Sequence, residues 1–322
     1  MSKLRWGVLG CASFAQRRTI PAMLQSPTVD LVGVASRSKE KAESFRSQFN
    51  LRRAYGSYED LLQDPEIEAV YIPLPNGLHA EWTIRSFESG KHCLCEKPFA
   101  SSAIEAAQVA GIASEKGMFA MEAFMWRLHS QHQRGMEAVI SGKVGSVRLV
   151  RAAFSYSIAR KFNVRLSPEL AGGSVLDVGC YPISVARYYF AAEPTSAFSR
   201  GDIDPEYNVD MAMSGILDFP AGRALIDCAF TLPYRTELEI VGESGRIFIP
   251  KPWLPDPEAT IEINGEQERL PPENQYVKQF EYFSNAVLSG RPPLYGPDDA
   301  VRQMRVIDAV RRSMSSGTAE AV

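Results

Sequence analysis

The chain contains 322 residues, more than the roughly 100–200 of a typical single domain, so we expect two domains. Hydrophobic residues make up 45% of the chain and charged residues 23%, and the net charge of −3 argues against binding to nucleic acids or anionic membranes. No apolar run approaches the roughly 20 residues of a membrane-spanning helix, and the first residues lack the pattern of a secretory signal, so we expect a cytoplasmic protein.

The first part of the chain alternates short apolar strands with helices. Strands are predicted at residues 4–9, 29–35, 69–72, 92–95 and 119–122. Helices are predicted at residues 14–25, 39–49, 57–62, 80–89 and 102–116. Repeated strand–helix units of this length imply a parallel sheet with right-handed crossovers, so residues 1–123 are predicted to form an α/β Rossmann dinucleotide-binding domain.

After about residue 124 the pattern changes to long strands joined by turns. These strands are predicted at residues 147–157, 209–219, 224–232, 237–241, 246–250 and 259–263. Helices are predicted at residues 131–141, 276–289 and 297–315, with one more after Tyr181. Residues 124–322 are therefore predicted to form an α+β domain built on a large, mainly antiparallel sheet.

The turn after the first strand resembles a degenerate dinucleotide-binding fingerprint. It comprises Gly10, Cys11, Ala12, Ser13, Phe14 and Ala15. Gly10 permits a tight turn, Ala15 allows close packing of helix on strand, and the backbone N–H groups that open the helix can hold a pyrophosphate. Ala12 stands where a second glycine is usual, and a purely structural turn remains an alternative.

Two further strand ends are candidate parts of the cofactor site. The second strand is followed by Ser36, Arg37 and Lys41 rather than by an acidic residue, which favours a 2′-phosphate and therefore NADP over NAD. The third predicted strand is followed by a loop that contains Pro73, Leu74, Asn76 and His79. Asn76 and His79 are expected to reach the ribose or the next loop; for His79, capping of the following helix is the alternative.

These motifs, together with two more, resemble the Gfo/Idh/MocA oxidoreductase family over almost the whole chain. The first additional motif is Glu96-Lys97-Pro98, and the second runs from Gly172 to Tyr181. The segment Met121–Arg127 resembles the branch that contains dihydrodiol dehydrogenases, xylose dehydrogenases and sugar-nucleotide 3-ketoreductases. Many family members carry histidine where this chain has Tyr181, which makes an inositol-type dehydrogenase less expected.

The resemblance implies several structural features. It implies a Rossmann domain followed by an open-faced sheet domain, a cis peptide bond before Pro98, and a homodimer or homotetramer formed through the second sheet. It also implies cofactor contacts from Glu96 and Lys97. Trp126 and Arg127, at the crossing between the domains, are expected to line the nicotinamide pocket, with a packing role as the alternative.

The chemistry predicted for the site is proton transfer coupled to hydride transfer on a sugar or a related polyhydroxylated alcohol or ketone. Tyr181 is the expected acid/base; a free tyrosine has a pKa of ~10, which a neighbouring Lys97 ammonium lowers. Asp177, four residues before Tyr181, is expected to bind a substrate hydroxyl or to hold Lys97. Arg165 is a second candidate for substrate binding. Each residue has a structural alternative: a surface ion pair, a core aromatic, a helix cap or a solvated arginine.

Other functions stay open. The main alternative is a non-catalytic protein that senses a dinucleotide on the same fold; another is an enzyme that keeps its cofactor bound and moves hydride between two sugars. We expect no metal, because neither His129 with His132 nor Cys93 with Cys95 has a suitable third ligand close in sequence. The five cysteines, an odd number without regular spacing, are expected to be reduced thiols.

Overall fold

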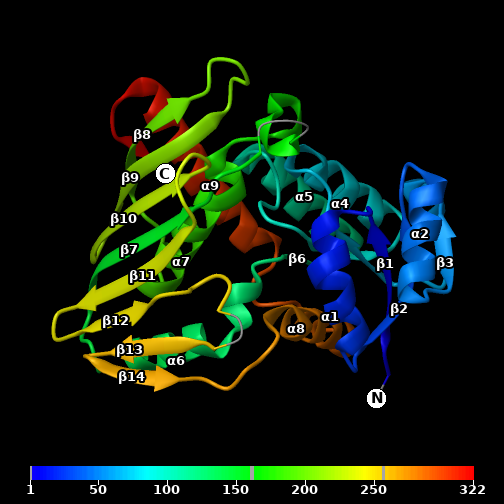
Figure 1. Ribbon diagram of the computed structural model, residues 1–322, viewed down its shortest axis with the longest axis horizontal. Helices are drawn as coiled ribbons and strands as arrows, with labels where there is room; N and C mark the ends of the chain where they lie inside the picture. The colour runs from blue at the N-terminus through cyan, green and yellow to red at the C-terminus, as the bar shows by residue number, and fades with distance from the viewer. Residues whose placement is uncertain (1, 160–162, 256–257) are drawn as a thin grey trace. The chain divides into compact units, whose positions relative to one another are not determined.

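The fold is described from a computed structural model that places residues 2–159, 163–255 and 258–322 (Figure 1). The chain forms two compact units, and each is built from two chain segments. The first unit contains Met1–Met125 and Asn274–Val301, and the second contains Trp126–Glu273 and Arg302–Val322. Residues 274–301 thus pack with the first unit. The predicted division, with one boundary after residue 123, does not include this return of the chain.

The first unit contains a six-stranded parallel sheet in the order β3-β2-β1-β4-β5-β6. Its strands are β1 (Leu4–Leu9), β2 (Val29–Ala35), β3 (Arg53–Tyr55), β4 (Ala69–Ile72), β5 (His92–Cys95) and β6 (Ala120–Glu122). The apolar, partly β-branched strands are almost wholly buried, as expected of a parallel sheet covered on both faces. This is the doubly wound arrangement that the alternating pattern predicts.

Helices connect these strands and cover the sheet. They are α1 (Ile20–Gln25), α2 (Lys39–Phe49), α3 (Tyr58–Leu62), α4 (His79–Glu88) and α5 (Ala103–Lys116), with a π-helical turn η1 (Ala15–Thr19) before α1 and a 3₁₀ turn η2 (Asn76–Leu78) before α4. Serine side chains cap α2, α3 and α5. Helix α8 (Gln275–Ser289) joins this unit, where Phe280 packs edge-on against Trp6 and Ser284 accepts a hydrogen bond from the Trp6 indole at 3.1 Å.

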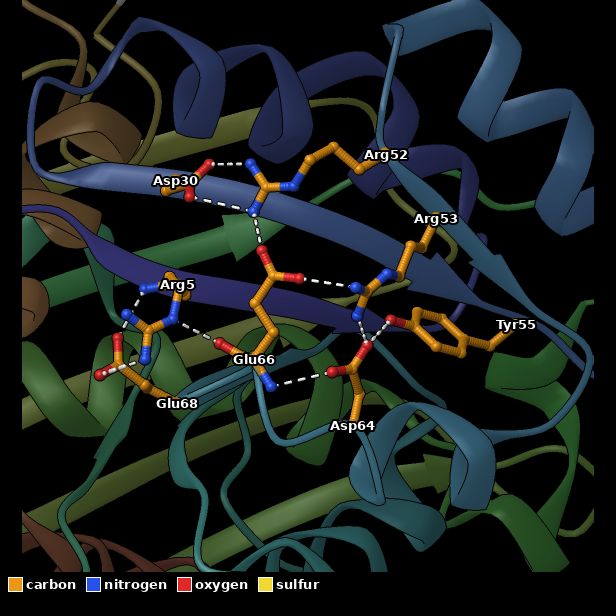
Figure 2. A network of polar contacts seen from close by, with 8 residues as sticks. All are labelled: Arg5, Asp30, Arg52, Arg53, Tyr55, Asp64, Glu66 and Glu68. Carbon is orange, nitrogen blue, oxygen red and sulfur yellow. Dashed lines mark hydrogen bonds and ion pairs between the residues drawn. The ribbon is translucent and has the colours of Figure 1, made fainter.

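A network of charged side chains lies at the amino-terminal edge of the parallel sheet (Figure 2). Arg52 binds both Asp30 and Glu66, and Arg53 binds both Glu66 and Asp64. The Asp64 carboxylate also accepts a hydrogen bond from the Tyr55 hydroxyl. Burial raises the pKa of Asp64, but the bonds from Tyr55, Arg53 and the Glu66 amide outweigh it and lower this pKa to about 2. The network therefore ties the starts of β2 and β3 to the segment that leads into β4.

The second unit contains a nine-stranded sheet in the order β14-β13-β12-β11-β7-β10-β9-β8-β15. Its strands are β7 (Val147–Ser155), β8 (Ser196–Ile203), β9 (Asp210–Phe219), β10 (Gly222–Ala229), β11 (Arg235–Gly242), β12 (Arg246–Ile249), β13 (Thr260–Ile263), β14 (Glu266–Arg269) and β15 (Glu320–Ala321). Neighbouring strands run antiparallel except for β7 and β10, which are parallel. The predicted α+β class is confirmed.

Helices cover one face of this sheet (Figure 1). They are α6 (Ser130–Ile140), α7 (Cys180–Phe190) and α9 (Pro297–Ser316), and a π-helical segment η6 (Val175–Gly179) leads directly into α7. Short 3₁₀ turns occur at η3 (Met125–Leu128), η4 (Val164–Leu166) and η5 (Pro168–Leu170). Buried serines join α9 to the sheet, since the Ser313 hydroxyl accepts a hydrogen bond from the Ser199 amide at 2.9 Å.

Several chain-wide expectations can be compared with this fold. The peptide bond between Lys97 and Pro98 is cis, as the resemblance implied. All five cysteines are free and buried. Within residues 2–159, 163–255 and 258–322, no helix is both long and apolar enough to cross a membrane. In the same ranges, no group of three or more histidine, cysteine or acidic side chains has the arrangement of a metal site.

Candidate active site

The candidate cofactor site lies at the carboxyl-terminal edge of the parallel sheet. The strand order reverses between β1 and β4, and open α/β sheets bind ligands in the crevice at such a reversal. Gly10 follows β1 with φ of +125°, and a Cβ there would approach the Leu74 side chain to 3.0 Å. Because Leu74 follows β4, the two predicted loops meet at this crevice, and the first of them needs glycine.

The turn that begins at Gly10 leads into the π-helical turn η1. The first amides of a helix have no intrahelical acceptor and can bind an anion, so this turn fits the pyrophosphate of a dinucleotide. The Cys11 thiol lies 3.9 Å from the carbonyl oxygens of Ala35 and Lys41, and burial raises its pKa to about 11. The Cys11 thiol therefore lies between the end of β2 and the first turn of α2, and its contact with the cofactor stays a prediction.

The end of β2 carries the residues expected to recognise a 2′-phosphate. Arg37 and Lys41 are exposed, whereas Ser36 is buried and its hydroxyl accepts a hydrogen bond from the Ser38 amide at 3.2 Å. The Ser38 side chain caps α2 by accepting from the Lys41 amide. The cap fixes the first turn of α2, which carries Lys41. Arg37 directly precedes the capping serine, and both cationic side chains are exposed where a phosphate can reach them.

His79 joins the loop after β4 to the loop after β5. Its Nδ1 lies 2.6 Å from the Pro98 carbonyl oxygen and its Nε2 lies 2.8 Å from the Leu74 carbonyl oxygen. Burial lowers the pKa of His79 to about 4, so the ring is neutral near pH 7 and donates one hydrogen bond. The ring does not cap α4, whose N-cap residue is Leu78. A direct ribose contact by His79 would require one of these interactions to break.

The catalytic candidate Lys97 follows β5, next to a hydrogen bond between Glu96 and Tyr71. Its neighbour Glu96 accepts a hydrogen bond from the Tyr71 hydroxyl at 2.6 Å, and the Glu96 amide donates to the Ile72 carbonyl at 3.2 Å. Both Glu96 and Lys97 are half-buried. Tyr71 lies on β4, so the end of β5 is fixed by backbone and side-chain bonds to the neighbouring strand. Sequence reasoning missed Tyr71, which reads as an ordinary core aromatic.

The other catalytic candidate, Tyr181, lies in the first turn of α7 in the second unit. Its ring packs edge-on against Phe154 of β7, with centroids 5.2 Å apart, and tilts against Trp253 at 5.3 Å. The Tyr181 residue is only 6% exposed. This aromatic wall fixes the plane of the ring. Neither Phe154 nor Trp253 stood out in the sequence, because each lies in a segment that reads as core.

Asp177 and Arg165, predicted to bind substrate, form an ion pair with each other. The Arg165 Nε lies 2.7 Å from Asp177 Oδ2, and the Tyr156 hydroxyl donates to the same oxygen at 2.8 Å. Asp177 is buried, and its charge raises the pKa of Arg165. Burial, together with the Asp177 charge, raises the pKa of Tyr156. Tyr156 therefore stays protonated as a donor; a polar aromatic near the end of a long predicted strand was the signal that could have identified it.

Glycine is needed at positions 172 and 173, because the chain there passes closely against other backbone and side-chain atoms. A Cβ on Gly172 would lie 2.5 Å from the Arg165 carbonyl oxygen. Gly173 has φ of +110°, and its amide donates to the same oxygen at 2.9 Å. The glycine pair thus holds the Arg165 segment next to η6, where Asp177 lies.

Trp126 and Arg127 are both buried in the second unit. Trp126 packs against His132, Tyr188 and Trp253, and Arg127 donates to the Ser184 hydroxyl at 2.7 Å. Both residues therefore have the packing role that was given as the alternative, and their contact with the nicotinamide stays a prediction.

Two further predicted cofactor residues lie in the loop after β4 of the first unit. Asn76 opens the turn η2, and Pro73 directly follows β4.

Comparison with known proteins identifies the family. Residues 4–124 match the oxidoreductase family with an NAD-binding Rossmann fold, and residues 132–248 match the GFO/IDH/MocA C-terminal domain. The chain belongs to the Gfo/Idh/MocA family. It is accordingly an NAD(P)-dependent oxidoreductase of the dehydrogenase/reductase class, as its motifs predicted.

Three members of the family illustrate the similarity. The NADP-dependent D-xylose 1-dehydrogenase 2 of Haloferax volcanii is 36% identical, with 98% of this chain and 99% of that protein covered. A 3-ketoreductase from Actinomadura kijaniata, solved with NADP and TDP-benzene, has a TM-score of 0.91 at 30% identity and covers 97% of this chain and 98% of its own. An aldose-aldose oxidoreductase from Caulobacter crescentus, complexed with glycerol, has a TM-score of 0.93 at 26% identity, with 99% and 100% covered.

The His79 bridge generates a prediction about cofactor affinity and stability. We expect His79→Ala to weaken NADPH binding about tenfold or more, because the loops after β4 and β5 lose their common support. The folded-state pKa of about 4 lies below the unfolded value of 6.5, so the stabilisation by His79 is complete above pH ~6.5 and is lost as the pH falls toward 4. The loss of unfolding free energy caused by the substitution should therefore shrink over that range.

Fluorescence titration with NADPH and urea unfolding at several pH values measure these effects. His92→Ala is the matched control, since His92 lies at the opposite end of β5 and accepts from the Phe119 amide at 2.9 Å. It should lower stability and leave NADPH affinity unchanged. Wild-type NADPH affinity in a folded His79→Ala protein would contradict the role of His79 in supporting the cofactor loops.

Proposed function

We propose that this protein is an NADP(H)-dependent oxidoreductase that transfers hydride between the nicotinamide and a sugar or related polyhydroxylated alcohol or ketone. The observation that carries the proposal is that Tyr181, fixed against an aromatic wall, lies one helical turn after the buried Asp177, whose carboxylate binds Arg165 and Tyr156. Such a group offers several hydrogen-bonding atoms next to one acid/base, which suits a substrate with many hydroxyls. The relatives named for D-xylose and for aldoses support the same substrate class.

The proposed roles follow from ordinary proton chemistry. The bound cofactor donates the hydride to a carbonyl carbon, or accepts it from a carbinol carbon. During reduction the Tyr181 hydroxyl gives its proton to the carbonyl oxygen, and during oxidation the phenolate takes the proton from the alcohol. The Lys97 ammonium stabilises negative charge on the phenolate or on the substrate oxygen. Asp177 and Arg165 hold substrate hydroxyls, and Tyr156 orients the Asp177 carboxylate.

Nothing specific favours the alternative of a non-catalytic sensor. The three relatives described above are all named as enzymes. The likeness to an aldose-aldose oxidoreductase keeps the hydride shuttle as a second candidate, because that name describes one aldose as the reductant and another as the oxidant. The two enzymatic candidates differ in whether nucleotide stays with the protein during purification.

The first test follows the absorbance of NADPH with a panel of ketosugars, and of NADP⁺ with aldoses that include D-xylose. We expect Tyr181→Phe and Lys97→Met each to lower kcat by on the order of 10²-fold or more, because each loses a group that acts on the transferred proton. Tyr188→Phe is the control: Tyr188 lies on the same helix and packs against Tyr189.

Full-speed turnover by either catalytic variant would refute the proposed roles. A wild-type protein that shows no turnover with the whole panel would refute the function. Nucleotide that stays bound through desalting, together with exchange of hydride between two sugars, would favour the shuttle.

The preference for NADP over NAD rests on Arg37 and Lys41, which extend from the end of β2 and the first turn of α2. We expect Arg37→Ala to weaken NADPH binding about tenfold, the size of one lost charge-assisted hydrogen bond, and to leave NADH binding unchanged. Arg46→Ala is the matched control, since Arg46 lies in the last turn of α2 and pairs with Glu43 at 2.6 Å. Equal losses for the two cofactors would contradict the preference.

We also propose that a second copy of the chain covers the sheet face opposite α7. This face presents both charge signs beside an apolar row that Phe198, Ile216 and Leu225 form across β8, β9 and β10, so it can complement a rotated copy of itself. The cations are Arg151, Arg200, Arg235 and Arg246, the anions are Asp227, Glu237, Glu239 and Glu262, and the apolar residues are Phe198, Ile216, Leu225 and Phe248. Phe198 is 37% exposed and Leu225 is 36% exposed, which is unusual for large apolar side chains in the middle of a sheet.

Analytical ultracentrifugation tests this proposal. The wild type should sediment as a dimer or tetramer, and Leu225→Arg should shift it toward the monomer by placing an unpaired charge in the interface. Ile140→Arg on α6 is the control, because Ile140 is 78% exposed and lies outside this face. A wild-type monomer at micromolar concentration would refute the proposal.

A further inference from the structure

A half-buried carboxylate marks the start of the segment that carries Asp177 and leads to Tyr181. Asp210, the first residue of β9, accepts two hydrogen bonds on the same oxygen. The Ser174 hydroxyl lies 2.7 Å from Asp210 Oδ2, and the Val175 amide lies 2.7 Å from it as well. Both donors belong to the residues that open η6, so Asp210 determines where this helical segment begins.

The packing around this carboxylate leaves little freedom. A Cβ on Gly173 would lie 2.2 Å from Asp210 Oδ1, so only glycine can precede the bonded pair. At the other end of η6, a Cβ on Gly179 would lie 2.9 Å from the Cys228 sulfur. The same sulfur is 3.6 Å from the Ser174 hydroxyl. The π-helical segment is therefore held closely against β9 and β10 at both of its ends.

The pKa of this carboxylate reflects its partial removal from water. Burial raises the pKa of Asp210, and the bonds from Ser174 and Val175 oppose that rise, as does the positive charge of Arg311. An acid removed from water in this way costs free energy unless donors compensate it. Here both donors belong to the segment that bears the candidate active-site residues. A cap needed only for helix stability could use an exposed serine or asparagine, as α2 and α8 do.

We propose that Asp210 is a positioning residue for the reaction. Resting on the proposed function, the inference is that its two hydrogen bonds fix η6 so that Asp177 and Tyr181 hold their places at the substrate. Asp177 lies two residues beyond Val175, and Tyr181 is the second residue of α7, which directly follows the same segment. Small displacements of acid/base and binding groups reduce turnover strongly. Asp210 itself touches no reacting atom.

The test compares three substitutions by two measurements. Asp210→Ala removes both bonds, Ser174→Ala removes one, and Asp210→Asn keeps a carbonyl oxygen that can accept both. Hydrogen–deuterium exchange of the peptide spanning residues 174–181 reports how well the segment is held, without any substrate. Turnover of the sugar substrate and the dissociation constant of NADPH report the consequence for the reaction.

We expect Asp210→Ala to speed exchange in this peptide and to lower kcat by on the order of 10–100-fold, with the NADPH dissociation constant unchanged. Ser174→Ala should lie between Asp210→Ala and the wild type, and Asp210→Asn should restore both readouts to within about threefold. Asp218→Asn is the matched control: Asp218 lies near the other end of β9 and also binds a serine hydroxyl and an arginine. It should leave exchange and turnover unchanged.

The remaining outcomes separate a failure of the positioning role from a failure of the proposed function. Unchanged exchange in Asp210→Ala would overturn the positioning role whether or not the protein is active. Faster exchange with unchanged kcat would overturn its importance for the reaction, and an Asp210→Asn protein as impaired as Asp210→Ala would overturn the hydrogen-bond explanation. A wild-type protein without turnover would refute the proposed function, and the exchange data would still decide whether Asp210 holds η6.

Discussion

The direction of the strands in the first unit is the constraint on which its candidate site depends. All six strands are parallel, so their carboxyl ends share one edge and every loop that follows a strand opens there. Gly10, Leu74 and Lys97 come from widely separated parts of the chain, and the sheet alone brings them to that edge. A few side-chain hydrogen bonds fix the loops at this edge. His79 joins two of the loops, and Tyr71 holds Glu96. The long-range ion pairs of Figure 2 lie at the other edge, away from the cofactor loops.

In the second unit, the candidate functional groups are held in place in a different way. Its candidate residues lie on one π-helical segment and the helix that follows, and this segment is fixed by bonds at its start and by close packing at its end. π-Helical turns are rare and often occur at functional sites. The other π-helical turn described above, η1, directly follows the dinucleotide-binding turn. In both units, the irregular turn stands next to residues that were singled out for chemistry.

Sequence reasoning identified the fold because the local signals agreed with one another. The alternation of apolar strands and helices, ended by glycines such as Gly117, predicted most elements of the first unit to within about two residues. It missed β3 and β15, which are very short, and β8, whose segment Ser196–Ile203 mixes small and charged residues and is mostly exposed beyond its first half. It also missed β14, a polar edge strand. Edge strands need not be apolar, so their sequences carry little signal.

The candidate site was less accessible to the same reasoning. Motifs identified the strand-end residues, because glycine and lysine at these positions have a direct physical reason. The partners of these residues lie far away in the chain: Tyr156 bonds Asp177, and Asp210 bonds Ser174 and Val175. Such pairings arise from the register of a sheet with long connections, which periodicity does not reveal. His79 was identified as a candidate but its two carbonyl contacts were not.

The burial of the cysteines has a practical consequence for work on this protein. Cys11 stands in the dinucleotide-binding turn, yet its sulfur is enclosed and its high pKa keeps it in the poorly nucleophilic thiol form. The remaining four are also enclosed. Alkylating reagents and mild oxidants therefore meet little reactive sulfur on the folded chain. A single cysteine introduced on the surface can carry a spectroscopic label while the native thiols stay in place.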